Sequence, residues 1–339
     1  MLDLLKKLCE LDAPSGSEGK VRDFILNEIK DYAECSVDSM GNIIAFKKGA
    51  RTPAKRIMID AHMDEVGFIV TSVDDGGYLR FTTLGGINPQ AIVGRRVRFV
   101  KDGTIGVVGV KPVHLCSADE KGKALKLSDL YIDIGATDKE QALSVVELGD
   151  SATFEGGLEE FGDGKLCGKA IDDRAGCAVL IEMIKSELPY DMYFTFTVQE
   201  ELGTRGAKTA TFSVAPDCAI VVEATTAADI SGVEPGERVC ELGGGAAISF
   251  MDRSTIYNKE LFDLCLKTGK EKGIKAQVKA AVAGGNNSGA VHLSRGGVLT
   301  LSVSVPCRYL HTASCVIAKD DLISVADIVR AMAEKMLEA

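Results

Sequence analysis

The chain has 339 residues, a formal net charge of −10 and no long run of lysine or arginine. This acidic surplus argues against nucleic acid or an anionic membrane as the main partner. Because hydrophobic residues make up 46% of the chain and charged residues 26%, we expect a globular protein with a large core, and the length favours two domains.

The ten cysteines are scattered along the chain, and no two of them form a Cys-x-x-Cys pair. A zinc ribbon or a thioredoxin-like site is therefore not expected, and we interpret the cysteines as reduced thiols of a cytoplasmic protein. The first residues have the pattern of an amphipathic helix and lack that of a signal peptide. Because no apolar run is long enough to span a membrane, no membrane partner is expected.

The first predicted elements are two helices. Leucines at positions 4, 5, 8 and 11 recur at helical spacing and should face a core. Pro14 ends this helix. Ser15 and Glu18 then predict a capping box that opens the second helix.

A short apolar strand follows and delivers His62 and Asp64 at its end. From there the strand-like runs become short and are broken by glycines, which is typical of a small β domain. We therefore predict that residues 68–162 form a β domain inserted into a larger catalytic domain, which consists of residues 1–67 and 163–339.

In the second half of the larger domain, acidic pairs lie next to predicted elements. Asp172 and Asp173 lead into a helix, and a strand over residues 193–198 runs into Glu200 and Glu201. Adjacent residues of an extended segment point to opposite sides, so the two glutamates should have different tasks, one in binding and one in proton transfer. The alternative is an exposed acidic turn at the end of a strand.

Further along, a short apolar strand ends at Glu223 and another, over residues 298–305, is followed by His311. Between them, residues 284–288 are predicted to open a helix that carries His292. Short apolar strands that alternate with amphipathic helices predict an α/β fold with a largely parallel sheet covered by helices. In such sheets, ligands bind beyond the carboxyl ends of the strands, where these acidic and histidine residues lie.

Two histidines and several carboxylates form a ligand set that suits zinc, cobalt or manganese. There are more candidate ligands than one catalytic zinc ion needs, and one carboxylate could bridge, so the set suits two ions. Each residue also has a structural alternative: His62 could be a core histidine, and Asp172 could cap a helix. Motifs typical of zincins, phosphate loops and serine hydrolases are absent from the sequence, and a glycosidase would need carboxyl groups spaced across a sugar bond.

Five segments together resemble the M42 metallo-aminopeptidases, which include the tetrahedral TET peptidases and proteins once called endoglucanase M. The segments are residues 61–68, 85–90, 169–174, 199–203 and 306–312. The resemblance covers essentially the whole chain. It implies an α/β fold with a mixed, largely parallel sheet covered by helices and a small inserted β-barrel-like domain, which serves dimerisation and assembly.

The resemblance also implies a site with two divalent metal ions, zinc or cobalt, with manganese as a further candidate. One ion would be held by His62 and Glu223, and the other by Glu201 and His311, with Asp172 bridging. Two residues would act beside the ions: Asp64 would accept the second N–H of the His62 ring, and Glu200 would be the general base. The implied substrates are peptides with a free N-terminus, and the implied assembly is a dimer that builds a dodecamer.

The sequence departs from the family pattern at two places. Many members have aspartate where this chain has Glu223, and the common Gly-Gly-Thr-Asp is replaced by Gly-Gly-Asn286-Asn287, which removes a carboxylate near the substrate site. Two alternatives to an aminopeptidase stay open. One is a metal-dependent deacylase or carboxypeptidase-like hydrolase with the same metals, and the other is a non-catalytic family member.

Overall fold

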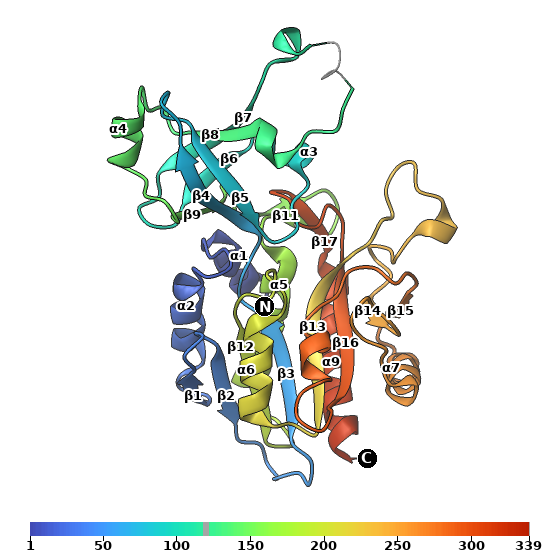
Figure 1. The fold of residues 1–339 in the computed structure, drawn as a ribbon. Coiled ribbons are helices and arrows are strands. Elements are labelled where there is room, and N and C mark those ends of the chain that lie inside the picture. The colour runs from blue at the N-terminus through green and yellow to red at the C-terminus, as the bar shows by residue number, and fades with distance from the viewer. Residues whose placement is uncertain (118–121, 339) are drawn as a thin grey trace.

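The computed structural model describes residues 1–117 and 122–338. Within these residues, eight strands form the largest sheet: β1 (Glu34–Val37), β2 (Ile43–Lys47), β3 (Ile57–His62), β12 (Met192–Thr197), β13 (Cys218–Thr226), β14 (Ala246–Ser249), β15 (Ala276–Lys279) and β16 (Leu299–Cys307). Their order is β1-β2-β12-β3-β13-β16-β14-β15 (Figure 1). The four neighbours β12, β3, β13 and β16 are parallel, whereas β2 and β14 run antiparallel to them.

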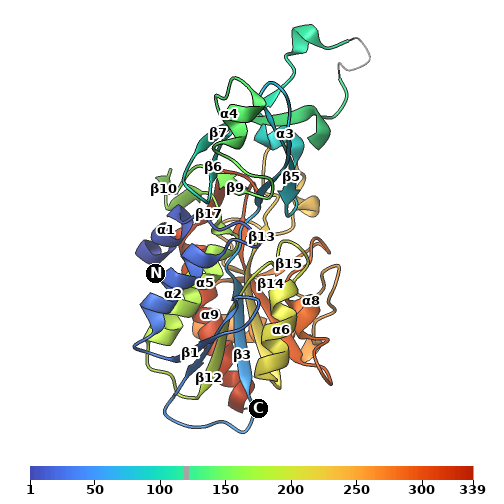
Figure 2. The ribbon, with the colours of Figure 1, turned by 60° about the vertical axis from the view of Figure 1, so that its left-hand side comes forward.

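Helices cover both faces of this sheet. The larger core is covered by α1 (Leu2–Glu10), α2 (Gly19–Ile29), α5 (Ile171–Lys185), α7 (Lys259–Lys272) and α9 (Lys319–Glu338). The opposite face is covered by α6 (Arg205–Val214) and α8 (Ser288–Val291). Figure 2 shows α1, α2 and α5 on one side of the sheet and α6 and α8 on the other. Most residues of the central strands are buried on both faces of the sheet, and most of these are apolar.

A closed barrel projects beyond one end of the large sheet (Figure 1). It consists of β4 (Gly67–Val73), β5 (Leu79–Leu84), β6 (Arg96–Phe99), β7 (Ile105–Val110), β8 (Leu130–Asp133) and β9 (Ser151–Phe154). Short helices, α3 (Pro89–Ile92), α4 (Lys139–Leu143), η1 (Val113–Leu115) and η2 (Leu127–Asp129), lie in its loops, and η3 (Pro235–Glu237) lies outside it. The barrel has its own core, in which Phe68 makes edge-to-face contacts with Phe81 and Phe154.

The predicted fold class, a mixed and largely parallel sheet with a small inserted barrel, is confirmed. The division into domains at residues 67/68 and 162/163, and the assembly role of the inserted segment, stay predictions. Residues 118–121 of that segment lie outside the described residues.

A third, antiparallel sheet connects two segments that carry predicted site residues. It consists of β10 (Leu158–Phe161), β11 (Lys165–Gly168) and β17 (Cys315–Ala318). Gly168, just before the Asp172 segment, pairs with Cys315, which lies just after His311. This pairing holds the loops of Asp172 and His311 side by side, although they are far apart in the sequence.

Two local predictions were wrong. Ser15 and Glu18 form no capping box, because the Ser15 hydroxyl donates to Asp64 and the Glu18 carboxylate accepts from the backbone N–H groups of Gly16 and Gln199. The predicted helix after residue 287 is only the four-residue α8, and His292 follows it. In both places, partners distant in the sequence replace the expected local structure. Among the described residues, none of the helices combines the length and apolar character that a membrane span requires.

Candidate metal centre

The predicted site residues meet at the carboxyl ends of the central parallel strands. His62 is the last residue of β3, and Glu201 lies in the turn after β12. Glu223 lies within β13, which continues to Thr226 rather than ending at the glutamate as predicted. His311 follows β16, and Asp172 lies in the first turn of α5. Parallel strands end at one edge of a sheet, so four segments from across the chain converge there.

Asp172 lies between the two histidines. Its Oδ1 is 3.2 Å from His62 Nε2, and its Oδ2 is 3.2 Å from His311 Nε2. Glu223 Oε2 is 3.6 Å from the same His62 nitrogen, and Glu201 Oε1 is 3.3 Å from the same His311 nitrogen. The five side chains therefore form two groups that share Asp172.

The contacts of Nδ1 show which nitrogen of each imidazole ring carries the hydrogen. His62 Nδ1 lies 2.9 Å from the backbone oxygen of Asp64, and His311 Nδ1 lies 2.9 Å from that of Gly86. A carbonyl oxygen only accepts hydrogen bonds, so each Nδ1 must carry a hydrogen. In the neutral rings, both Nε2 lone pairs therefore face carboxylate oxygens, which is unfavourable unless a cation or a proton lies between them.

The pKa values of the two histidines show that the centre favours positive charge. Burial opposes protonation of His311, but Asp172 and Glu201 raise its pKa to about 10. Burial likewise lowers the pKa of His62, yet Glu223 and Asp172 raise it well above its ordinary value. Only 1% of the His62 side chain is exposed against 28% of His311, so the centre is open to solvent from the His311 side.

Two carboxylate oxygens in the centre have no hydrogen-bond partner among the described residues. They are Oε1 of Glu201 and Oε1 of Glu223, and both are buried. Burial raises the pKa of both glutamates well above the ordinary value. Because unpartnered buried carboxylates are costly, these oxygens and the two Nε2 atoms fit divalent cations, and nitrogen and oxygen donors of this kind suit zinc, cobalt or manganese.

Asp173 also lies near His62 and Glu223 and could complete a cluster with them. Its carboxylate, however, accepts from the backbone N–H groups of Gly176 and His62, at 2.9 and 3.3 Å. It is therefore engaged in holding the backbone, whereas Asp172 has one oxygen toward each histidine. We prefer Asp172 as the bridging residue.

Asp64 offers two acceptors to the ring of His62. Its backbone carbonyl, rather than its carboxylate, is the closer acceptor for His62 Nδ1, at 2.9 Å against 3.4 Å. The carboxylate accepts from the backbone N–H groups of Glu200 and Glu201, at 2.9 and 3.2 Å. Asp64 thus positions both the histidine ring and the turn that carries the two glutamates.

Glu200 and Glu201 do not lie on an extended segment, contrary to the prediction. Strand β12 ends at Thr197, and Gln199 has a φ of 54°, so the chain turns before the glutamates. The charges of Asp172 and His311 act on both carboxylates. Burial, together with the charges of Asp64 and Asp172, raises the pKa of Glu200 to about 7. A carboxyl group with such a pKa can both accept and donate a proton near neutral pH.

Sequence reasoning missed a buried ion network beneath the centre. Glu65 accepts from Lys169 Nζ at 2.8 Å, from Thr153, and from the backbone of Ala13. The guanidinium of Arg174 lies 3.4 Å from Glu65 and donates to three backbone carbonyls, those of Leu8, Leu11 and Met63. The network ties the end of α1 and the barrel strand β9 to the segment of Asp172. Nothing local in the sequence signals it, because its members come from four segments.

Asn287 stands where the family pattern often has an aspartate. Asn287 is fully buried, and its Nδ2 donates to Asp60 and Thr197, at 2.8 Å each. Asp60 therefore gives the buried amide a carboxylate partner, and the effect of the missing aspartate on the substrate site stays a prediction.

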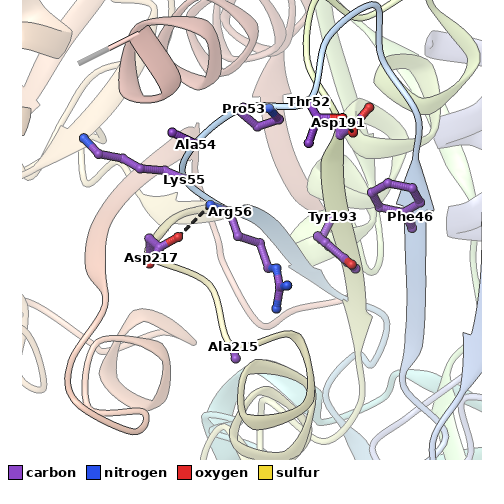
Figure 3. Close-up of a pocket in the computed structure, with 10 residues that line it drawn as sticks. All are labelled: Phe46, Thr52, Pro53, Ala54, Lys55, Arg56, Asp191, Tyr193, Ala215 and Asp217. Carbon is purple, nitrogen blue, oxygen red and sulfur yellow. Dashed lines mark hydrogen bonds between the residues drawn. The ribbon is translucent and has the colours of Figure 1, made fainter.

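A cleft of about 470 Å³ lies at the opposite end of the sheet, where the parallel strands begin (Figure 3). Its polar groups serve the fold: Asp217 accepts from the backbone of Arg56, and Asp191 accepts from Gly49 and Thr52. The Arg56 guanidinium donates to a backbone carbonyl and stacks on the ring of Tyr193. This cleft therefore offers no convergent catalytic groups, and the cluster at the carboxyl ends is the candidate site.

Comparisons with known proteins show which family the chain resembles. A family model described as M42 glutamyl aminopeptidase matches residues 41–328. A relative from Acetivibrio thermocellus is 44% identical over 92% of both chains. The lysyl aminopeptidase of Pyrococcus furiosus is 31% identical, with 98% of this chain and 97% of the relative covered. The TET1 peptidase of Pyrococcus horikoshii, which can assemble into a tetrahedron or a large octahedral shell, is 33% identical, with a TM-score of 0.84 and 98% of each chain covered.

The buried ion network should be essential for stability. Replacing Lys169 by methionine leaves Glu65 without its closest cation, so the free energy of unfolding should fall by about 3–5 kcal/mol. The control is Lys165→Met in the neighbouring strand β11, whose ammonium donates to the backbone oxygen of Asp163 in the preceding turn. This variant should change stability by less than about 0.5 kcal/mol. Chemical denaturation measures both, and equal effects would contradict the assigned role.

Divalent cations should stabilise the folded chain by relieving the crowding of carboxylates. At about 100 times its dissociation constant, zinc or cobalt should raise the free energy of unfolding by about 2.7 kcal/mol. The Asp172→Asn variant should lose most of this gain, whereas Asp163→Asn, at an exposed position, should keep it. Thermal unfolding with and without metal measures the effect, and an unchanged response of Asp172→Asn would refute the bridging position.

Proposed function

This chain belongs to the M42 family of glutamyl aminopeptidases and is therefore a peptide hydrolase, and we propose that it removes N-terminal residues from peptides at a site for two metal ions. The family is metal-dependent, and the chain has a cluster of histidine and acidic side chains that could bind metal. The observation that carries the proposal is the position of Asp172 between His62 and His311, with one oxygen toward each.

In the proposed site, His62 and Glu223 would hold one ion, Glu201 and His311 the other, and Asp172 both. Zinc or cobalt fits this donor set best, and manganese is a further candidate. When bound, the ions would supply Lewis acidity, which polarises a carbonyl group and makes a water molecule more acidic. Backbone carbonyls orient both imidazole rings, so the ligands are held before any ion binds.

Glu200 is the proposed general base. Its carboxylate would take a proton from the attacking water and deliver it to the nitrogen of the leaving peptide. The raised pKa of about 7 supports this role, and the hydrogen bond from its backbone N–H to Asp64 fixes its position. The free amino group of the substrate would lie among the carboxylates, and this would restrict cleavage to the first peptide bond.

We further propose that the chain assembles through its barrel into dimers, and that these form a dodecamer. The similarity to the TET1 peptidase of Pyrococcus horikoshii, which forms closed shells, supports self-association. We also propose a cytoplasmic location, which is supported by ten cysteines that form no disulfide among the described residues.

The base assignment predicts a specific kinetic defect. Glu200→Gln should lower kcat at least about 100-fold, because an amide cannot accept the proton. Metal content and thermal stability should stay close to those of the parent, because Glu200 is not a proposed ligand. Steady-state kinetics with elemental analysis measure both, with Glu159→Gln, at an exposed position, as the control. A Glu200→Gln protein with bound metal and full activity would refute the assignment.

A substrate panel tests the reaction type. Peptides with a free N-terminus should be cleaved at the first bond, whereas the same peptides with an acetylated N-terminus should react at least about 100-fold more slowly, because they lack the amino group that the carboxylates attract. Mass spectrometry of the products identifies the bond that is cut. Preference for acetylated substrates would favour the deacylase or carboxypeptidase-like alternative.

A further inference from the structure

Side chains from other segments hold the backbone of the turn that carries Glu200 and Glu201. Four consecutive N–H groups of this turn donate to such side chains: Val198 to Asn42, Gln199 to Glu18, and Glu200 and Glu201 to Asp64. In helices and sheets, such groups donate to backbone carbonyls instead. The path of this turn is therefore determined by three side chains that lie far from it in the sequence.

The turn needs this support because its backbone has an uncommon conformation. Gln199 has a φ of 54°, in the left-handed region that residues other than glycine rarely adopt. Such a conformation persists where the surrounding structure fixes it. The carboxylate of Glu18 accepts from the N–H group of this same residue, at 3.1 Å. Glu18 therefore acts at the position that sets the direction in which the chain enters Glu200.

Ser15 acts on the same turn through Asp64. Its hydroxyl donates to Oδ2 of Asp64 at 2.5 Å, and both side chains are buried. The same oxygen accepts from the N–H group of Glu201, whereas Oδ1 accepts from that of Glu200. The hydroxyl of Ser15 thus holds the carboxylate in the orientation in which its two oxygens reach two successive N–H groups.

The segment that carries Ser15 and Glu18, between α1 and α2, is itself fixed. Three contacts hold it, which join the backbone of Ser15 to that of Glu65, Asp12 to Arg98, and Ser17 to Ser151. The partners in the last two contacts belong to the barrel strands β6 and β9. Side chains position another group well only where their own backbone is held in place, and this segment meets that condition.

We infer that Glu18 and Ser15 are positioning residues that hold Glu200 where its carboxylate exchanges a proton with the attacking water. This inference rests on the proposed function, in which Glu200 is the general base. Glu18 acts through the N–H group of Gln199, and Ser15 acts through Asp64. A general base must lie within hydrogen-bond reach of the proton that it takes. A displacement of about 1 Å can lower the rate about 100-fold.

The competing explanation is that Glu18 only fixes its own loop, through the N–H group of Gly16 at 2.7 Å. A loop defect lowers stability or activity by the same factor whether or not residue 200 is a glutamate. A positioning residue acts through Glu200, so its effect on the rate disappears when Glu200 is replaced. A double-mutant cycle therefore separates the two explanations.

The test uses the metal-loaded full chain, well below its unfolding temperature. Glu18→Ala should lower kcat about 10- to 100-fold, with KM and metal content close to those of the parent. In the Glu200→Gln background, the same substitution should lower the residual kcat less than about 2-fold, and equal factors in both backgrounds would overturn the inference. Glu18→Gln should keep most of the activity, because both hydrogen bonds reach Oε1 and an amide oxygen also accepts them. A loss as large as that of Glu18→Ala would contradict the positioning role.

Ser15→Ala removes a single hydroxyl and provides a second test where Glu18→Ala does not fold. It should lower kcat in the same direction, again only in the presence of Glu200, and a parent-like kcat would overturn the role of Ser15. The control is Ser17→Ala, whose hydroxyl contacts Ser151 in the barrel and which should leave kcat unchanged. Full activity of Glu200→Gln would refute the proposed base itself. A parent-like kcat of Glu18→Ala beside an inactive Glu200→Gln would overturn the positioning role alone.

Discussion

The candidate site depends on an accumulation of negative charge that the protein itself does not neutralise. Three carboxylates and two imidazole nitrogens face one another at distances of 3.2–3.6 Å, and two of the carboxylate oxygens lack any hydrogen bond among the described residues. Charges of one sign held this close in a buried site repel strongly. The cluster is therefore stable only with protons or cations among its members, and this demand for positive charge is what the proposed chemistry would use.

The surrounding scaffold holds these groups at positions that they would not adopt alone. Immediately below the centre, Glu65, Lys169 and Arg174 form a buried network in which the carboxylate oxygens of Glu65 have partners. Asp64 fixes the His62 ring through its backbone and the glutamate turn through its carboxylate. The pairing of β11 with β17 holds the loops of Asp172 and His311 next to each other. A network whose polar atoms have hydrogen-bond partners thus supports a cluster in which two carboxylate oxygens have none among the described residues. The network holds the cluster in place and does not neutralise its charge.

The two ends of the large sheet differ in how their carboxylates are engaged. At the carboxyl ends of the parallel strands, Oε1 of Glu201 and Oε1 of Glu223 are buried and have no hydrogen-bond partner among the described residues. In the cleft at the opposite end, Asp191 and Asp217 accept from nearby backbone N–H groups and a hydroxyl. Only the first arrangement leaves carboxylate oxygens available to a cation.

Periodicity and motif position in the sequence predicted the sheet class and a small β domain, and they placed histidine and acidic residues at the strand ends, whereas the barrel shape was implied by the resemblance to the family. They were sufficient because the carboxyl ends of parallel strands necessarily meet at one edge, so local patterns imply a distant neighbourhood. The tertiary structure alone decided which atoms of Asp64 lie beside the His62 ring, where Ser15 and Glu18 find partners, and that Asn287 is buried against Asp60. These features depend on contacts between residues tens to hundreds of positions apart, and their energies come from burial and charge, which no local pattern records.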